Sequence, residues 1–352
     1  METQQRSTEY NLQGVMYFFR REKVQCRYQF SLRDAVDITL LQRALTTALA
    51  SAPYYTQRLV QEKREMWLEP NTEPCLVYPG STMRNIPEET NGYLFCVSCE
   101  GDTVYFDWYH FLLDGHGVSP LFTSILEQYC NLRYGTTFAV QQIVCDPPYD
   151  MEAMLAEYPS VEGGSDAIQR DVVQTYEGAL RRTRVCLSKQ SLVEKALANN
   201  AKPVSALMGL LCMAMREYLG KENIQYSYSS DTRDVAGVPN ALYNCVCSFE
   251  HTVQLQANTR LADFVSDVDA DIKRDLQPQS KRRRMTEQMG WVYKVDQQKA
   301  PLRIKQRVFQ MGEYIGGTIS DFWLSYLGNP LMPATPELAQ YTTDFGVWVP
   351  PE

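Results

Sequence analysis

The sequence predicts an α+β protein in which a mixed sheet packed with helices occurs twice, once in each of two lobes. The chain of 352 residues is long enough for about two domains of roughly 150 residues each. Strand-like alternation and helix-like periodicity start again after a stretch rich in proline, glycine and acidic residues at 145–166. We therefore expect a first lobe over residues 1–150, a linker or crossover over 151–170, and a second lobe over 171–352.

The first lobe is predicted to open with a half-buried strand and a helix. Hydrophobic residues alternate with polar ones over residues 24–30, which is the period of a strand with one buried face. Asp37 comes directly before hydrophobic residues at helical spacing, so we expect it to be the N-cap, and Pro53 ends the helix. A short strand is expected near residues 66–68.

A β-hairpin and a further helix follow. Residues 94–99 and 103–110 have strand character and flank a turn that contains Gly101. Ser119 and Pro120 are typical of an N-cap and a first helical residue. The residues between the strand and the helix therefore form a loop, where reactive side chains are often displayed.

The second lobe is predicted to contain strands and helices in a similar mixture. Strands are expected at residues 182–187, 224–228, 243–255 and 314–327. Helices are expected at residues 191–199, 205–219 and 261–276. Gly220 is the expected end of the second of these helices.

The composition is that of an acidic protein with scattered cysteines. The net charge is −8 and the pI is about 5.2, which argues against a nucleic-acid partner because phosphate binding requires a basic face. Most of the ten cysteines lie in apolar runs, as buried reduced thiols do. Cys96 and Cys99 form a C-x-x-C, but no second ligand pair follows, so we expect no metal site.

Neither export nor membrane insertion is predicted. The N-terminus lacks a hydrophobic signal region. The longest apolar run, residues 204–215, is shorter than the span of about 20 residues that crosses a bilayer. We therefore expect a cytoplasmic protein without a membrane span.

Two of the three histidines lie in one short segment. The residues from His110 to Gly115 read H-F-L-L-D-G and are followed by His116, whereas His251 lies elsewhere, where a structural role is expected. A neutral imidazole is the commonest biological base near pH 7, because its unperturbed pKa is about 6.5. His110 is therefore the first candidate for acid–base chemistry, with a buried structural histidine as the alternative. Asp114 fits either a helix cap or an ion pair.

These residues resemble the condensation-domain and CoA-dependent acyltransferase superfamily, which includes nonribosomal peptide condensation domains, chloramphenicol acetyltransferase and alcohol acetyltransferases. The family motif is H-H-x-x-x-D-G, and this chain has Tyr109 in place of the first histidine. Further segments resemble the family in the same order along the chain. They are the helix and proline of 36–53, the arginine-bearing loop of 229–233, the strand that carries Asn244, and the S-Y-L-G of 325–328.

The resemblance implies two chloramphenicol-acetyltransferase-like lobes with an active-site tunnel between them. It implies an acyltransferase in which His110 deprotonates an alcohol or amine that attacks an acyl thioester. Asp114 would be structural and pair with Arg233 of the second half, and Gly115 would let the backbone approach the substrate channel closely. The other residues expected near the channel are Tyr109, His116, Asn244 and Ser325.

The resemblance also implies the substrates. No cofactor is bound permanently, and the co-substrate is an acyl-CoA or an acyl-phosphopantetheine on an acyl or peptidyl carrier protein. The acceptor is a small alcohol or amine. The basic run from Lys281 to Arg284 is either a solvated loop or a contact for coenzyme A phosphates or an acidic carrier protein.

Two other hypotheses stay open, because a fold does not fix a function. One is a non-catalytic scaffold or binding protein of the same fold, motivated by Tyr109 and by a second lobe that we expect to be truncated after the 325–328 segment. The other is a stand-alone condensation enzyme that uses carrier-bound thioesters. Asn244 fits a hydrogen bond within the sheet as well as a substrate contact. The sequence identifies neither the acyl donor, nor the acceptor, nor the oligomeric state.

Overall fold

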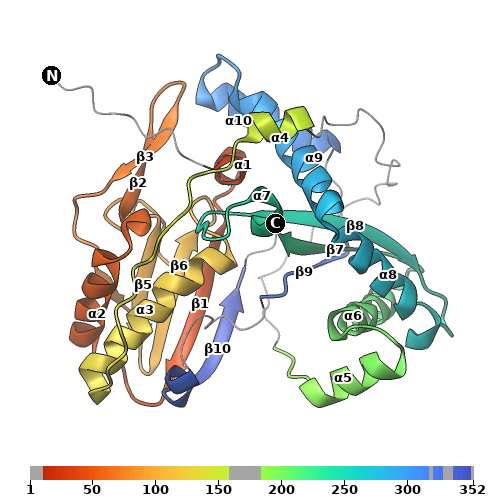
Figure 1. Cartoon of the computed structure of the whole chain (residues 1–352), viewed down its shortest axis with the longest axis horizontal. Helices are drawn as coiled ribbons and strands as arrows, with labels where there is room; N and C mark the ends of the chain where they lie inside the picture. Colours follow the sequence, from red (N-terminus) through yellow and green to blue (C-terminus); the bar gives the residue numbers. More distant parts are fainter. Residues whose placement is uncertain (1–10, 158–183, 317–319, 328–335, 350–352) are drawn as a thin grey trace.

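The computed structural model describes residues 11–157, 184–316, 320–327 and 336–349 (Figure 1). Helices and strands form two lobes that lie side by side, each with a sheet of its own (Figure 1). The predicted α+β fold, in which mixed sheets pack with helices, is confirmed.

The first lobe is built on a five-stranded sheet. Its order is β10 (Thr342–Trp348), β1 (Gln25–Leu32), β6 (Thr103–Tyr109), β5 (Phe95–Glu100) and β4 (Val77–Pro79). Strand β1 is antiparallel to both neighbours, and β5 and β6 are the predicted hairpin, whereas β4 is parallel to β5. Tyr28 and Phe30 of β1 are buried against Trp108 and Phe345, which accounts for the alternation in the sequence.

Helices α2 (Ile38–Ala50) and α3 (Gly115–Tyr134) pack side by side on this sheet (Figure 1). The first half of the chain also contains α1 (Leu12–Phe19), α4 (Met151–Glu157), a 3-10 turn η1 (Pro53–Thr56) and a separate strand pair β2 (Gln57–Gln61) and β3 (Met66–Pro70). Asp37 caps α2 as predicted, since its carboxylate accepts the amides of Thr39 and Leu40 at 2.9 and 3.1 Å. The ring of Phe122 in α3 lies 4.9 Å from that of Phe30, so α3 packs directly on β1.

The second lobe is built on a three-stranded sheet. Its order is β8 (Val246–Gln254), β7 (Asn223–Asp231) and β9 (Phe322–Leu324). The helices around this sheet are α5 (Lys189–Ala198), α6 (Pro203–Leu219), α7 (Arg233–Ala236), η2 (Leu261–Asp263), α8 (Val265–Asp275) and α9 (Pro278–Asp296). Helix α10 (Leu302–Gly316) packs on α1 and α9, and η3 (Pro336–Gln340) packs on α3 and β10 of the first lobe. Gly220 ends α6 with a φ of +67°, as the sequence predicted.

The two lobes exchange segments. Strand β10, close to the end of the chain, pairs with β1 in the first sheet, with Arg27 opposite Trp348. A boundary at residue 171 assigns this strand to the second lobe, whereas its hydrogen bonds place it in the first. Met285 and Met289 of α9 and Phe309 of α10 likewise belong to the hydrophobic core of the first lobe. Segments distant in sequence therefore hold the lobes together.

The predicted start of α3 is wrong. The helix begins after Asp114 rather than after Ser119, because the Asp114 carboxylate accepts the amide of Gly117 and provides an earlier cap. Pro120 lies inside the helix, where it lacks the N–H that would donate to the carbonyl four residues earlier, so one backbone hydrogen bond is lost.

Two predicted strands of the second lobe are also wrong. Residues 184–187 form no strand, and 182 and 183 lie outside the described residues. Val185 and Leu187 are exposed there, so alternation alone did not create a strand without a partner. The strand predicted over 314–327 is limited to β9, because α10 continues to Gly316.

In the part of the chain that the structure describes, no helix is both long enough and apolar enough to cross a membrane. The ten cysteines are free thiols, and most of them are buried.

Candidate active site

His110 follows the last residue of β6 and is held by three separate segments. Its amide donates to the carbonyl of Val24 at 2.8 Å, which fixes it to the start of β1. Its ring stacks face to face on Tyr17 of α1, with the ring centroids 4.1 Å apart and 10° between the planes. Its carbonyl accepts a hydrogen bond from the side-chain amide of Asn244, which belongs to the second half of the chain. The imidazole therefore lies where the two lobes meet.

Asp114 is buried and accepts hydrogen bonds from both halves. Oδ1 accepts the amide of Gly117 at 2.8 Å and Nη2 of Arg233 at 2.9 Å, and Oδ2 accepts the amide of Cys245 at 3.0 Å. Burial alone raises the pKa of this carboxyl. The nearby guanidinium and the amide donors outweigh burial, so the pKa of Asp114 is lowered from its ordinary value and the group stays ionised.

Arg233, the first residue of α7, completes this pair. Besides Asp114 it donates to the carbonyls of Ala241 and Tyr243, at 2.7 and 2.9 Å, and to the carboxylate of Asp231 at 3.1 Å. Burial lowers the pKa of the guanidinium, but Asp114 more than compensates and the pKa is raised. The predicted contact between Asp114 and Arg233 is confirmed, and Asp114 is a helix cap as well as an ion-pair partner.

The residues just before and at the start of β8 are tied to the first lobe. The carbonyl of Asn244 accepts from the side chain of Asn11, which also caps α1. The side-chain amide of Gln13 bonds both the amide and the carbonyl of Val246, as a neighbouring strand would. Sequence analysis missed Asn11, Gln13 and Tyr17. Asn11 before an apolar helix is a visible N-cap signal, but nothing in the spacing indicates a partner more than 200 residues away.

Glycines allow the close approach of the two halves. A Cβ on Gly115 would lie 2.6 Å from Cδ2 of Leu327 and 2.8 Å from the hydroxyl of Tyr28. A Cβ on Gly117 would lie 1.6 Å from the carbonyl oxygen of Leu242, so no side chain fits there. Gly115 thus makes a close approach as expected, but to side chains, and Gly117 is the position where two backbones meet.

The other predicted site residues have different surroundings. Tyr109 is buried in the first core, its hydroxyl donates to the carbonyl of Tyr17, and burial raises its pKa. His116 is exposed, with Nδ1 3.7 Å from Oδ2 of Asp231. Ser325 is exposed just beyond β9.

Asn244 does not make the predicted hydrogen bond within the sheet, and its predicted contact with a substrate stays a prediction. Its side-chain nitrogen fixes the backbone of His110 rather than a strand neighbour. Its side-chain oxygen is buried and receives no hydrogen bond in the described part of the chain. A buried acceptor beside the candidate base is therefore available to a donor from a ligand.

His251 is tied into the second lobe. Its Nε2 lies 2.6 Å from Oδ2 of Asp275, which also accepts from the hydroxyl of Tyr228 at 2.7 Å. Its Nδ1 lies 3.7 Å from a carboxylate oxygen of Asp271. This network joins β7 and β8 to α8, in line with the structural role expected from the sequence.

The basic run at the start of α9 is engaged within the chain. Lys281 is buried and pairs with Asp234, and Arg284 pairs with Glu250 at 3.0 Å. Arg283 pairs with Glu287 in the next helical turn. These contacts account for the run without a coenzyme A phosphate or a carrier protein.

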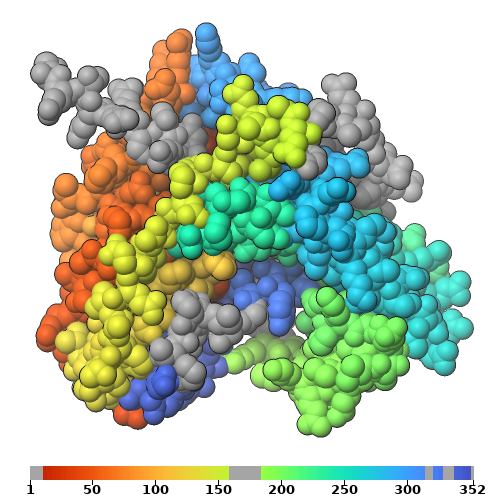
Figure 2. All heavy atoms as spheres, viewed as in Figure 1, coloured from red at the N-terminus to blue at the C-terminus, as the bar shows by residue number. Residues whose placement is uncertain are grey.

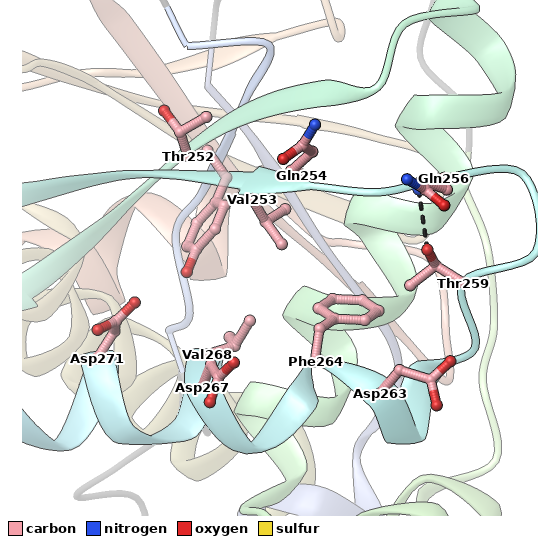
Figure 3. A pocket seen from close by; sticks show the side chains of 11 residues that line it. Thr252, Val253, Gln254, Gln256, Thr259, Asp263, Phe264, Asp267, Val268 and Asp271 are labelled. Atoms are coloured by element: carbon pink, nitrogen blue, oxygen red, sulfur yellow. Dashed lines mark hydrogen bonds between the residues drawn. The ribbon is translucent and has the colours of Figure 1, made fainter.

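The surface of the molecule is indented between the first lobe and the α5–α6 pair (Figure 2). A hollow with a volume of about 500 Å³ lies elsewhere, in the second lobe between β8 and α8 (Figure 3). None of the predicted site residues lines it. A tunnel passing His110 stays a prediction. Among the described residues, no group of three His, Cys, Asp or Glu side chains is arranged to hold a metal ion.

Comparisons with known proteins identify the fold. No family model matches the chain, and no curated protein sequence matches it. Polyketide synthase associated protein 5 from Mycobacterium tuberculosis is similar in structure, with a TM-score of 0.62 at 18% identity over 96% of this chain and 86% of that one. TRI101 of F. sporotrichioides, solved with coenzyme A and T-2, gives 0.62 at 9% identity over 97% and 88%. The first condensation domain of the CDA synthetase gives 0.52 at 13% identity over 78% and 77%.

At sequence identities of 9–18%, the structural similarity shows the fold alone. The chain has the two-lobed fold of condensation domains and CoA-dependent acyltransferases. The resemblance first seen around His110 is confirmed at that level.

Proposed function

We propose that this protein is an acyltransferase that moves an acyl group from a thioester to a hydroxyl or amine, with His110 as the general base. The observation that carries the proposal is the position of His110. Its backbone is fixed by the second lobe, its ring is fixed by Tyr17, and it lies where the lobes meet. The solved neighbour TRI101 binds coenzyme A, which supports a CoA thioester as the donor.

In the proposed reaction the imidazole of His110 takes the proton of the acceptor O–H or N–H as that atom attacks the thioester carbonyl. A tetrahedral intermediate forms, the C–S bond breaks, and the imidazolium returns the proton to the leaving thiolate. General-base assistance of this kind contributes about 10²–10⁴-fold in rate. Alignment of the two substrates between the lobes would supply much of the remainder.

The remaining site residues are proposed to support this reaction without transferring protons. Asp114 is ionised and fully engaged with Arg233 and two backbone amides, so it holds the loop after His110 in place. Gly115 allows close packing on the second lobe. The buried oxygen of Asn244 would accept a hydrogen bond from the substrate, for example from an amide of a pantetheine arm.

The proposed setting follows from the same features. We infer two lobes with the boundaries predicted from the sequence, except that β10 belongs to the first sheet. Free thiols fit a reducing, cytoplasmic compartment, where acyl-CoA is available. The acceptor would be a small alcohol or amine, as T-2 is the small molecule solved with TRI101.

The test is a thiol-release assay with acyl-CoA donors of increasing chain length and a panel of alcohols and amines. His110→Ala should lower turnover by about a hundredfold or more, whereas the unfolding temperature should not change. His116→Ala is the matched control, because this neighbouring imidazole is exposed, and its turnover should stay within a few-fold of wild type. Equal turnover of His110→Ala and wild type would rule out the proposed base and favour a non-catalytic scaffold.

The donor is tested separately with the same acyl group on coenzyme A and on a phosphopantetheinylated carrier protein. The intramolecular ion pairs of Lys281 and Arg284 favour neither donor, but the solved neighbour TRI101 binds coenzyme A, so we expect the CoA thioester to be used at least as well. Turnover with the carrier-bound thioester alone would identify a stand-alone condensation enzyme.

A further inference from the structure

Strand β8 is an edge strand of the second sheet. It pairs with β7 on one side only, in the order β8-β7-β9. The direction of its backbone groups alternates along the strand. Ser248 directs its amide and carbonyl away from β7, to side chains of α9, whereas the amide of Leu255 donates toward the β7 side, to the carbonyl of Glu222 at 2.8 Å. By the same alternation, the backbone groups of Glu250, Thr252 and Gln254 point outward.

Among the outward positions of β8, Ser248 is the one whose backbone groups are bonded by another element. The amide of Ser248 donates to Gln288 at 3.1 Å, and its carbonyl accepts from Gln288 and from Arg284. In the described part of the chain, no hydrogen bond from outside the sheet reaches the backbone of Glu250, Thr252 or Gln254. Three consecutive outward positions therefore form an open edge, which is a template for another strand.

The open edge borders a space large enough for side chains. A hollow of about 500 Å³ lies between β8 and α8, as Figure 3 shows. Thr252, Val253 and Gln254 line it on the strand side, and Phe264 and Val268 line it on the helix side. A strand added beside β8 would direct alternate side chains toward α8 and into this hollow.

The negative charge of the residues that line the hollow favours an added strand with basic side chains. Asp263, Asp267 and Asp271 line it along one side, at successive turns of η2 and α8 (Figure 3), and no lysine or arginine is among its lining residues. The side chains of Asp263 and Asp271 also pair with Arg260 and Arg274, whereas Asp267 has no ion pair in the described part of the chain. Basic side chains in the hollow would meet the uncompensated negative charge of Asp267.

We propose that the edge of β8 from Glu250 to Gln254 is a docking site for an extended, basic segment of a partner polypeptide. The partner adds a fourth strand to the sheet through backbone hydrogen bonds, and its basic side chains contact the carboxylates of α8. A second copy of this chain fits less well, because it would place one acidic edge against another in a protein of net charge −8. This docking site is independent of the reaction proposed for His110.

The probe is a fluorescent ten-residue peptide of alternating lysine and valine, titrated into the full-length protein and followed by anisotropy. We expect saturable binding that weakens as salt is raised, because exposed charge pairs are screened. The same peptide N-methylated at alternate residues should bind about tenfold or more weakly, because it cannot donate several hydrogen bonds to the strand edge. A peptide of alternating glutamate and valine should not bind.

Two protein variants locate the site. Thr252→Pro removes an outward amide that β7 does not use, so it should weaken binding without loss of the β7–β8 ladder. Asp267→Asn should weaken binding about two- to fivefold, as expected for one exposed charge pair. Glu100→Gln, at an exposed acid in the first lobe, is the matched control and should have no effect.

Three results would overturn the proposal. They are equal affinity of the methylated and unmethylated peptides, equal affinity of the basic and acidic peptides, and a dimer in sedimentation that Thr252→Pro dissociates but the basic peptide does not. The peptide titrations use the wild-type protein. They therefore still test the proposal if the Thr252→Pro variant does not fold.

Discussion

His110 directly follows strand β6 of the first sheet and His251 lies within strand β8 of the second, but their imidazoles have different neighbours. The ring of His110 stacks on the face of Tyr17, and its backbone carbonyl accepts from Asn244 of the other lobe. The ring nitrogens of His251 face carboxylates instead, with Asp275 at 2.6 Å. The face of the His110 ring thus contacts an aromatic side chain, and the nitrogens of His251 contact carboxylates.

This difference shows what separates a candidate base from a structural histidine. The residue type is the same in the two cases. The network of His251 ties β8 to α8 within one lobe, whereas the contacts of His110 come from both lobes. A base for two substrates must be reachable between the lobes, and of these two residues His110 is the one held by segments of both lobes.

The sharpest test of the comparison replaces each histidine in turn. His110→Ala should lower kcat by about 10²–10⁴-fold with little change in the free energy of unfolding. His251→Ala should do the opposite, because it leaves Asp275 partly buried without one of its partners. It should cost about 1–3 kcal/mol of stability and leave kcat within a few-fold of wild type. Thiol release measures kcat, and urea unfolding measures stability. A large loss of kcat in His251→Ala would contradict the assignment of His251 to a structural role.

The next test removes the ion pair that supports the His110 loop. Asp114→Ala should lower the free energy of unfolding by about 3–5 kcal/mol, because it leaves Arg233 buried and partly unpaired. Asp231→Ala is the control, since it removes a half-exposed carboxylate from the same arginine and should cost at most about 1 kcal/mol. Similar losses in the two variants would show that burial of the pair is not what matters.

The same pair predicts a pH dependence. The pKa of Asp114 is lowered below its ordinary value of 3.8, so its contribution to stability is complete above that pH. As the pH falls from 3.8 through the lower folded-state pKa, the contribution is lost. The difference in unfolding free energy between wild type and Asp114→Asn should therefore be constant near neutral pH and shrink below pH 3.8. A difference that grows in acid would contradict the assigned direction.

The smallest expected effect comes from the stack on His110. Tyr17→Leu removes the aromatic face, and a stacked pair is worth about 0.5–1.5 kcal/mol, so kcat should fall roughly two- to tenfold with KM unchanged. Tyr17→Phe keeps the face and should restore kcat. If Tyr17→Phe is as slow as Tyr17→Leu, the hydroxyl rather than the stack positions the imidazole.

Much of the local structure follows from the sequence. Alternation over residues 24–30 predicts β1, Asp37 predicts the start of α2, and Gly220 predicts the end of α6. These features depend on backbone propensity and on burial of one face, which neighbouring residues determine. The contact between Asp114 and Arg233 was expected because both lie in segments that resemble one superfamily.

Other features were decided by the tertiary structure. Asp114 replaced Ser119 as the cap of α3 because its carboxylate could also meet Arg233 and the amide of Cys245. Strand β10 joins the first sheet although more than 300 residues separate it from β1. Strand periodicity states which face of a strand is buried, but it does not state which strand is its neighbour.

The sequence by itself therefore determined several elements, such as β1, α2 and the β5–β6 hairpin, together with the two-lobed fold class and the candidate base. Only the tertiary structure decided that Tyr17, Gln13 and Asn244 surround that base or its support. The physical reason is that a hydrogen bond or a ring stack depends on positions fixed by the packing of distant segments. Local sequence constrains backbone angles and burial, and it carries no record of which distant side chain completes a contact.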